Sequence, residues 1–215
     1  FELGYEKTSL EDLFTIAQEA KKDYKISEEK DQKTETCLRN FLRFNSSLTE
    51  TVGTELVYEV KQDDKNDISL NGIIDRVIKG KDGGYLIIDY KTSKREKSKV
   101  ELYQDSQLKG YVYAISKLYD TPISNVVAAH YYPLTNNFVF VQYSVPQINS
   151  HLRKVVDQIW TIRKKKKEEL RATRNEFCNW CAYKTACPEF NDPMQCTKKI
   201  EELKAKKKSS SKSRK

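Results

Sequence analysis

The sequence predicts an α/β domain, a mixed central sheet flanked by helices, followed by a cysteine-ligated C-terminal segment. Two observations predict the domain. Runs with helical spacing of apolar residues are followed by strand-like runs and further helical ones, and 215 residues are enough to bury one sizeable core. A third observation predicts the segment, because four of the five cysteines lie between Cys178 and Cys196.

The first part of the chain is predicted to form two helices. Residues 8–24 place apolar side chains at helical spacing, and Ser9 is a candidate N-cap with Asp12 three residues later. Residues 25–35 are polar, so we expect a loop there. Residues 37–44 (CLRNFLRF) are expected to form the second helix, with its apolar side chains facing inward.

Strands follow at residues 54–61, 69–79 and 84–91, which are rich in Val, Ile, Leu and Tyr. The segment KGKDGG at 79–84 predicts a tight turn, because glycine adopts positive φ readily. A polar loop comes next. The remaining elements are expected as a helix, a pair of strands and a long amphipathic helix, at residues 103–119, 126–132, 138–145 and 148–160.

The charge is unevenly distributed along the chain. The net charge is +8, and most of the basic excess lies in residues 163–174 and 198–215. Such clusters suit a polyanion such as nucleic acid, while a solvated helix face and a disordered tail are the alternative. No apolar run reaches membrane-spanning length and no signal-peptide pattern is present, so we expect a cytoplasmic protein. Because the chain begins with Phe1, we expect a domain or fragment of a longer protein.

Acidic and basic side chains stand at the ends of two apolar strands. Asp75 ends GIID, and Asp89 and Lys91 end YLIIDYK. Alternate strand residues share a face, so Asp89 and Lys91 point the same way. Buried charges are costly unless something uses them. Two carboxylates suit Mg²⁺ or Mn²⁺, and the lysine suits a reacting water or phosphate. The alternative is an ordinary hairpin with exposed charges.

The spacing Cys178-x2-Cys181-x5-Cys187 places two thiolates on one tight turn and a third nearby. This arrangement suits a tetrahedral thiolate site for zinc or an iron–sulfur cluster, and spacing alone does not choose between them. Buried free cysteines are the remaining alternative.

These motifs together resemble the PD-(D/E)XK nuclease superfamily. The chain is most similar to the RecB-like branch, which includes AddB-type helicase-nucleases and CRISPR-associated iron–sulfur exonucleases. That branch has a strand reading G-x-x-D, a strand reading D-Y-K-T and a helix carrying Q-x-x-x-Y. The corresponding segments here are Gly72–Asp75, Asp89–Thr92 and Gln107–Tyr111. The resemblance implies a restriction-endonuclease-like core.

The resemblance also implies roles for individual residues. Asp75 and Asp89 would be metal ligands and Lys91 the catalytic lysine, while Gln107 and Tyr111 would shape the site and contact the DNA backbone. Many relatives carry a histidine in the first helix with a glutamate three residues later. Thr8 and Glu11 stand at those positions here. Glu11 is thus the candidate third acid, and Thr8 leaves open a weakened or inactive nuclease.

The two histidines of the chain, His130 and His151, do not fill that gap. His130 falls on a strand and His151 on the long helix, and we expect structural roles for both.

For the cysteines, the resemblance implies a 4Fe-4S cluster that staples the C-terminus onto the nuclease core, with zinc as the alternative. The fourth ligand would be a cysteine upstream of Phe1, then Cys37, then Cys196, in that order of preference. The predicted domains are the nuclease core at 1–174, the cysteine segment at 175–197 and a basic disordered tail at 198–215.

The predicted function is that of a metal-dependent DNA nuclease, an exonuclease acting on single strands or ends in repair, recombination or phage- and CRISPR-type processing. A helicase domain upstream would be its partner. Two alternatives are a nuclease-derived module that binds DNA without cutting it, and a zinc-stabilised interaction domain.

Overall fold

The computed structural model describes residues 9–22, 28–45, 50–63, 68–166, 169 and 171–191. Described residues up to Gln158 form one compact unit, and those from Ile159 onward form a second. The tail at 198–215 lies outside the described residues, and the domain limits given above stay a prediction. Within the described part, no helix is both long and apolar enough to cross a membrane.

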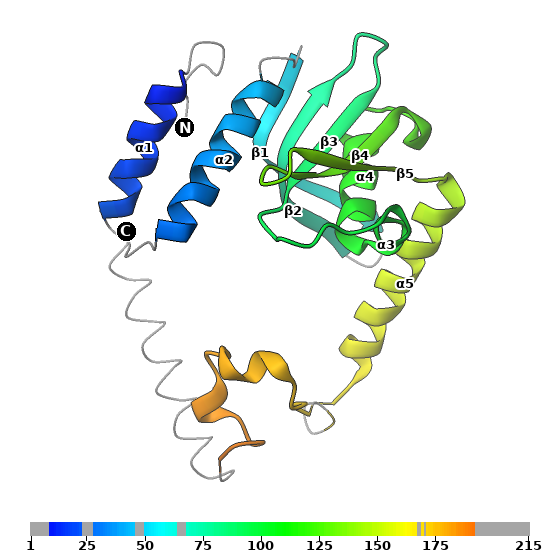
Figure 1. Cartoon of the computed structure of the whole chain (residues 1–215). Coiled ribbons are helices and arrows are strands. Elements are labelled where there is room, and N and C mark those ends of the chain that lie inside the picture. Colours follow the sequence, from blue (N-terminus) through cyan, green and yellow to red (C-terminus); the bar gives the residue numbers. More distant parts are fainter. Residues whose placement is uncertain are drawn as a thin grey trace, which may run out of the picture. The chain divides into compact units, whose positions relative to one another are not determined.

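The first unit is built on a five-stranded sheet with helices before, between and after its strands (Figure 1). The elements run α1 (Leu10–Lys22), α2 (Glu28–Asn45), β1 (Glu50–Asp63), β2 (Ile68–Lys79), β3 (Tyr85–Tyr90), α3 (Lys99–Gln104), α4 (Ser106–Leu118), β4 (Val126–Tyr132), β5 (Asn137–Gln142) and α5 (Val145–Lys164). The sheet order is β1-β2-β3-β4-β5, and only the β3–β4 pair is parallel. The predicted mixed α/β architecture is therefore confirmed.

One face of the sheet carries the larger core. Ile87 of β3, Ala128 of β4 and Val141 of β5 pack with apolar side chains of α4 such as Leu108 and Val112. The parallel step from β3 to β4 requires a crossover, and α4 lies in it, as in a β-α-β unit. The first residues of α5 extend the same core through Ile148 and Leu152.

The opposite face carries a smaller core, covered in part by α2. Phe44 of α2 packs on Tyr131 and Phe138, with ring centroids 5.0 and 4.8 Å apart. Ile78 and Ile88 complete this cluster. The two faces of β3 are therefore both apolar, which explains the nearly continuous apolar run YLII.

The N-terminal helices agree only in part with the prediction. The Ser9 cap of α1 is confirmed, because the Asp12 amide donates to Ser9 Oγ at 3.1 Å and Ser9 N–H donates back to Asp12 Oδ2 at 2.8 Å. The predicted loop at 25–35 is wrong from Glu28 onward, where α2 begins. Its Glu, Gln and Lys residues are good helix formers, and Glu35 pairs with Arg39 one turn later at 2.7 Å.

The hairpin between β2 and β3 forms at the predicted turn. Gly83 has φ +82°, a left-handed conformation that favours glycine. Gly80 N–H donates to Gly84 O at 2.8 Å, and Asp82 Oδ1 accepts from Gly84 N–H at 3.1 Å. The predicted turn is therefore confirmed.

The helix predicted at 103–119 is confirmed from Ser106 to Leu118, but its start is wrong, because Asp105 separates α4 from the short helix α3. The Asp105 carboxylate accepts from the amides of Gln107 and Leu108, at 3.0 and 3.1 Å, and so caps the start of α4. Its backbone is extended, with ψ 115°, which ends α3. An aspartate side chain can hydrogen-bond to backbone amides in this way and so interrupt a helix. The apolar spacing continues on both sides of Asp105, so the sequence pattern does not reveal the break. This cap fixes where α4 begins, and it therefore fixes the position of Gln107 in the first turn.

Candidate active site

Asp89 and Lys91 lie at the C-terminal end of β3, on the face covered by α4. The strand alternates regularly there, so Asp89 shares the side of Ile87, and Lys91 follows on the same side. Lys91 N–H donates to Tyr131 O at 2.8 Å, which continues the pairing with β4 beyond the end of the strand. Lys91 Nζ lies 2.5 Å from Asp89 Oδ2. The structure thus brings these two predicted residues together.

Asp75 lies where the sheet opens. The β2–β3 pairing runs only from Lys79 to Arg76, and beyond Arg76 the two strands separate. Asp75 Oδ2 then accepts the Tyr90 amide at 2.8 Å and replaces the missing backbone partner. This contact holds the Asp75 carboxylate next to the segment Asp89–Lys91.

The electrostatics of Asp89 set it apart from a surface acid. Burial raises the pKa of Asp89, the Lys91 ammonium opposes that shift, and the charges of Asp75 and Asp105 raise the pKa further. Asp89 Oδ2 is buried and has no hydrogen bond of ordinary geometry among the described residues, although it forms the ion pair with Lys91. A buried carboxylate beside a second carboxylate fits a divalent cation that prefers oxygen ligands.

Gln107 and Tyr111 face the same site from the first two turns of α4. Gln107 Nε2 donates to Tyr111 OH at 2.7 Å, and Gln107 Oε1 accepts from Lys91 Nζ at 3.4 Å. The two residues therefore lie one turn apart on the same face of α4. Burial raises the pKa of Tyr111 to about 12, so this phenol stays protonated at neutral pH. The amide of Gln107 is fixed at both ends and orients the lysine.

Gly72, the first residue of the G-x-x-D motif, makes room for an aromatic side chain. Tyr58 of β1 lies across it, and a Cβ at Gly72 would come within 2.8 Å of Tyr58 OH. Tyr58 in turn packs edge-on against Tyr111, with ring centroids 6.0 Å apart. The glycine thereby supports the position of Tyr111.

The substitution Gly72→Ala is expected to lower the free energy of unfolding by about 1–3 kcal/mol, because it overpacks a buried ring. Chemical denaturation measures this effect. Tyr58→Phe removes the atom nearest to the added methyl group, so the double variant should recover part of the loss. Strictly additive effects of the two substitutions would contradict the assigned contact.

Three further residues surround Asp89 and were not predicted from the sequence. His130 of β4 is fully buried, and its Nε2 lies 3.6 Å from Asp89 Oδ2 and 3.9 Å from Asp105 Oδ2. Lys97 Nζ lies 2.7 Å from the same Asp105 oxygen. The structural role expected for His130 stays a prediction. Only the parallel register, which sets His130 opposite Asp89, reveals this relation.

The third predicted acid is not gathered with the other two. Glu11 lies on α1, which packs against α2, and Thr8 lies outside the described residues. In the described ranges, no three His, Cys, Asp or Glu side chains are gathered so that they could hold a metal ion. Two carboxylates suffice for Mg²⁺, which commonly uses one or two of them together with waters and substrate phosphates. The role of Glu11 stays a prediction.

The described cysteines of the second unit lie in and around two short 3-10 helices, η3 (Glu176–Asn179) and η4 (Lys184–Ala186), with Cys178 in η3 and Cys181 in the turn after it. Cys181 N–H donates to Cys178 O at 3.4 Å, so these two residues stand on one turn, as expected. Cys187 follows η4. These three cysteines and Cys37, which lies on α2 in the first unit, are free thiols. Cys196 lies outside the described residues.

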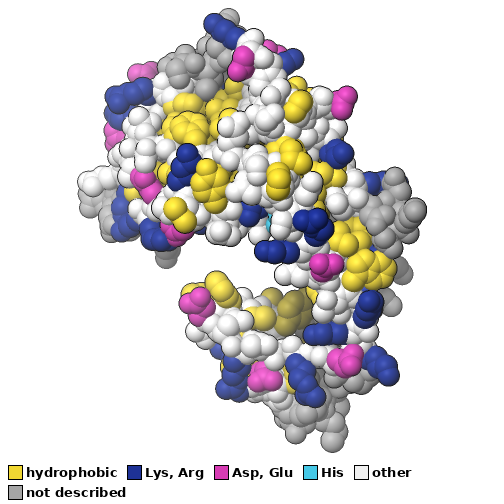
Figure 2. Space-filling view, turned by 90° about the vertical axis from the view of Figure 1, so that its right-hand side faces the viewer, with side chains coloured by type: hydrophobic (Ala, Val, Ile, Leu, Met, Phe, Trp, Pro, Cys, Tyr) yellow, Lys and Arg dark blue, Asp and Glu magenta, His cyan; other side chains and the backbone are white. Residues whose placement is uncertain are grey.

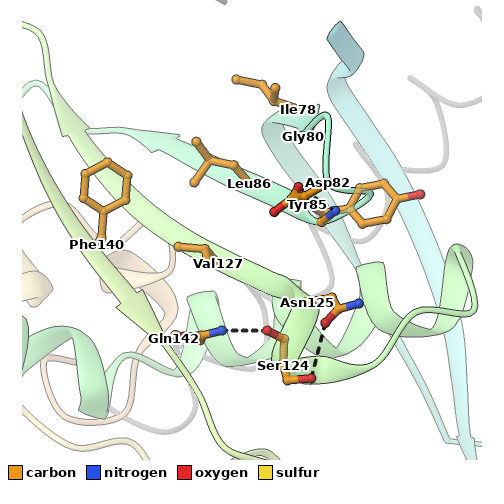
Figure 3. Close-up of a pocket in the computed structure, with 11 residues that line it drawn as sticks. Ile78, Gly80, Asp82, Tyr85, Leu86, Ser124, Asn125, Val127, Phe140 and Gln142 are labelled. Atoms are coloured by element: carbon orange, nitrogen blue, oxygen red, sulfur yellow. Dashed lines mark hydrogen bonds between the residues drawn. The ribbon is translucent and has the colours of Figure 1, made fainter. Parts of the chain in front are cut away.

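A separate hollow of about 480 Å³ lies at the other end of β3 and β4, where these strands begin (Figure 3). Leu86, Val127 and Phe140 form its apolar floor. At its rim, Gln142 Nε2 donates to Ser124 O at 2.6 Å. Asp89 and His130 lie three residues beyond Leu86 and Val127 along the two strands, so the hollow is not the candidate active site.

The family model described as the PD-(D/E)XK nuclease superfamily matches residues 2–188. A search among curated proteins gives no match. The matched range contains every residue of the site described above and the cysteines up to Cys187.

Proposed function

The chain belongs to the PD-(D/E)XK nuclease superfamily, and on that premise we propose that it hydrolyses DNA phosphodiester bonds with Mg²⁺ or Mn²⁺. The observation that carries the proposal is the buried Asp89 carboxylate, paired with Lys91 and lying beside Asp75. Burying a charged carboxylate is energetically unfavourable, so such a group is expected where it binds a metal ion and contacts a reacting group. Family membership supports a metal-dependent nuclease in general, and DNA is the substrate proposed here.

In this proposal, Asp75 and Asp89 would hold the metal ion. When bound, the ion would supply an activated water and would stabilise negative charge on the phosphate. Lys91, held between Asp89 and Gln107, can neutralise the phosphate or orient the attacking water. Tyr111 fixes the Gln107 amide so that its oxygen faces the lysine.

Two runs of basic residues in the sequence support a polyanionic substrate. On the face drawn in Figure 2, Lys and Arg side chains are dispersed among acidic and apolar ones. The concentrated basic runs are at 163–174 and 198–215, and the second of these lies outside the described residues. Such runs give affinity for the DNA backbone that does not depend on base sequence and that falls steeply with salt.

Finer assignments rest on the resemblance to the RecB-like branch. We propose an exonuclease that acts on single strands or ends, with a role in repair, recombination or phage- and CRISPR-type processing. A helicase domain upstream and a cytoplasmic location belong to the same proposal.

The central test is the metal requirement. Purified protein is expected to degrade linear DNA with Mg²⁺ or Mn²⁺ and to stop when EDTA removes the ion. Asp75→Asn should lose this activity, because it removes one of two carboxylate ligands. Its matched control is Asp82→Asn, in the turn at the far end of the hairpin, which should cleave like the parent. Cleavage that persists in EDTA, or in the Asp75→Asn variant, would contradict the assignment.

The second candidate function is that of a module that binds DNA without cutting it. Thr8 at the histidine position and the separate place of Glu11 favour it. This candidate predicts DNA binding by the parent protein with no cleavage at any Mn²⁺ concentration. It also predicts that Asp75→Asn leaves DNA binding unchanged.

For the second unit, we propose a 4Fe-4S cluster ligated by Cys178, Cys181 and Cys187, with zinc as the alternative. The support is the presence of three free thiols within ten residues, two of them on one turn. An upstream cysteine, Cys37 or Cys196 would be the fourth ligand, in that order.

Anaerobically purified protein is expected to be brown and to contain about four iron atoms per chain. Each of the substitutions Cys178→Ser, Cys181→Ser and Cys187→Ser should lower that iron content. Colourless protein that contains one zinc per chain would instead establish the alternative, a zinc-stabilised segment.

A further inference from the structure

The imidazole of His130 is completely buried, and its Nε2 lies near two carboxylates. Its exposed fraction is 0 %, and its Nε2 is a buried polar atom with no hydrogen-bond partner among the described residues. The nearest acidic oxygens are Asp89 Oδ2 at 3.6 Å and Asp105 Oδ2 at 3.9 Å. Enclosing a polar ring in this way is costly unless it interacts with its neighbours.

The two carboxylates nearest the ring already have cationic partners. Lys91 pairs with Asp89, and Lys97 pairs with Asp105. A fully buried ring beside completed ion pairs fits the neutral form, which carries a single N–H. Which nitrogen bears that proton decides what the ring can do.

The other side of the ring indicates which nitrogen that is. His130 Nδ1 lies 3.4 Å from Tyr132 OH, and the same hydroxyl accepts the Lys97 amide at 2.8 Å. The Tyr132 proton is then free to point at Nδ1. The opposite tautomer would leave a bare nitrogen lone pair at Nε2, between two carboxylates. Donation from Tyr132 to Nδ1, with the ring proton on Nε2, gives Nδ1 a donor and directs the Nε2–H group toward the two carboxylates.

We propose that His130 is a positioning residue whose Nε2–H faces Asp89 and Asp105, orients the Asp89 carboxylate and ties β3 to the start of α4. As far as it concerns the metal, this inference rests on the proposed function. Asp105 caps α4 and so directs Gln107 in its first turn. The proton on Nε2 therefore links the two elements that carry the candidate site. A displacement of about half an ångström would bring Nε2 and Asp89 Oδ2 within hydrogen-bond range.

The tautomer can be measured on the unmodified protein. The chain has only two histidines, so ¹⁵N-histidine labelling gives two ring spin systems, and His151→Gln assigns them. At neutral pH the ring of His130 is expected to show a protonated Nε2 and an unprotonated Nδ1. A protonated Nδ1 with a bare Nε2 would overturn the proposal, whether or not the protein cleaves DNA.

The coupling to Asp89 has its own readout. Asp89→Asn is expected to shift the ¹H and ¹⁵N resonances of the Nε2–H group strongly. Asp82→Asn, in the distant turn, should leave them unchanged. This comparison needs no metal and no cleavage, so it separates failure of the inference from failure of the proposed nuclease function. Equal resonances in the parent and the Asp89→Asn variant would overturn the inference.

Two variants of His130 test its effect on metal binding. His130→Leu keeps apolar bulk but removes the donor, whereas His130→Gln places an amide N–H near the Nε2 position. His130→Leu is expected to weaken Mn²⁺ binding, measured by calorimetry, by about 10–100-fold, while His130→Gln stays within about threefold of the parent. His151→Gln serves as the control. Undiminished Mn²⁺ binding by folded His130→Leu protein, or equal losses in both variants, would overturn the metal part of the proposal.

Discussion

Asp89→Asn is expected to lower DNA cleavage by at least ~10²–10³-fold, the scale on which loss of one electrostatic contact at a reacting centre acts. The same substitution is expected to raise the free energy of unfolding at neutral pH. Burial raises the pKa of Asp89, so the folded chain holds this charge at a cost. An amide of the same shape removes the charge and keeps the volume. Loss of activity together with a gain in stability distinguishes a site residue from a structural one.

The stability change caused by Asp89→Asn is expected to depend on pH. Between the ordinary aspartate pKa of 3.8 and the raised value in the folded state, the folded protein binds more protons than the unfolded one. The contribution of Asp89 to stability therefore becomes less favourable as the pH rises through this window. The Asp89→Asn variant lacks that change. The gain in stability should accordingly be small below pH 3.8 and largest above the folded pKa, as measured by denaturation at several pH values.

Lys91→Met is the matched comparison. It should abolish cleavage as well, but it leaves the buried Asp89 without its cationic partner, so stability at neutral pH should fall rather than rise. Lys91 is itself about one-third exposed, so the Asp89→Asn variant leaves it hydrated and still near Gln107. Destabilisation by Asp89→Asn, or cleavage at the parental rate by either variant, would contradict the assigned roles.

The site could be predicted from the sequence wherever it depends on local periodicity. The two-residue period of a strand places Asp89 and Lys91 on one side, and the helical turn places Gln107 above Tyr111. The glycine turn fixes the hairpin that carries them. These features need only a few neighbouring residues, so the pattern of one chain is enough to find them.

The contacts of His130 could not be found in this way. They depend on which residue of β4 lies opposite Asp89, and the two strands are separated by a crossover that contains α3 and α4. No local pattern encodes that register. The helix break at Asp105 could not be predicted for a different reason. The apolar spacing continues across it, so the helix break follows from hydrogen bonds of its carboxylate.

The second large predicted effect is a loss of stability when the core next to the site is truncated. Ile87 and Ile88 are consecutive in β3 and both have an exposed fraction of 0 %, but they face opposite sides of the sheet. Replacing either by alanine is expected to lower the free energy of unfolding by about 2–5 kcal/mol. Since a typical domain is stable by about 5–15 kcal/mol, either change removes a large share of the total.

The two losses should differ in size. Ile87 lies in the large core beneath α4, where strands and helix hold the cavity walls in place, so Ile87→Ala should fall near the upper limit. Ile88 packs in the small cluster with Tyr131, beside Phe44 of α2, and that helix can move inward to fill part of the space. Ile88→Ala should therefore fall near the lower limit. Urea denaturation of both variants measures the difference, and a larger loss for Ile88→Ala would show that α2 is held as rigidly as α4.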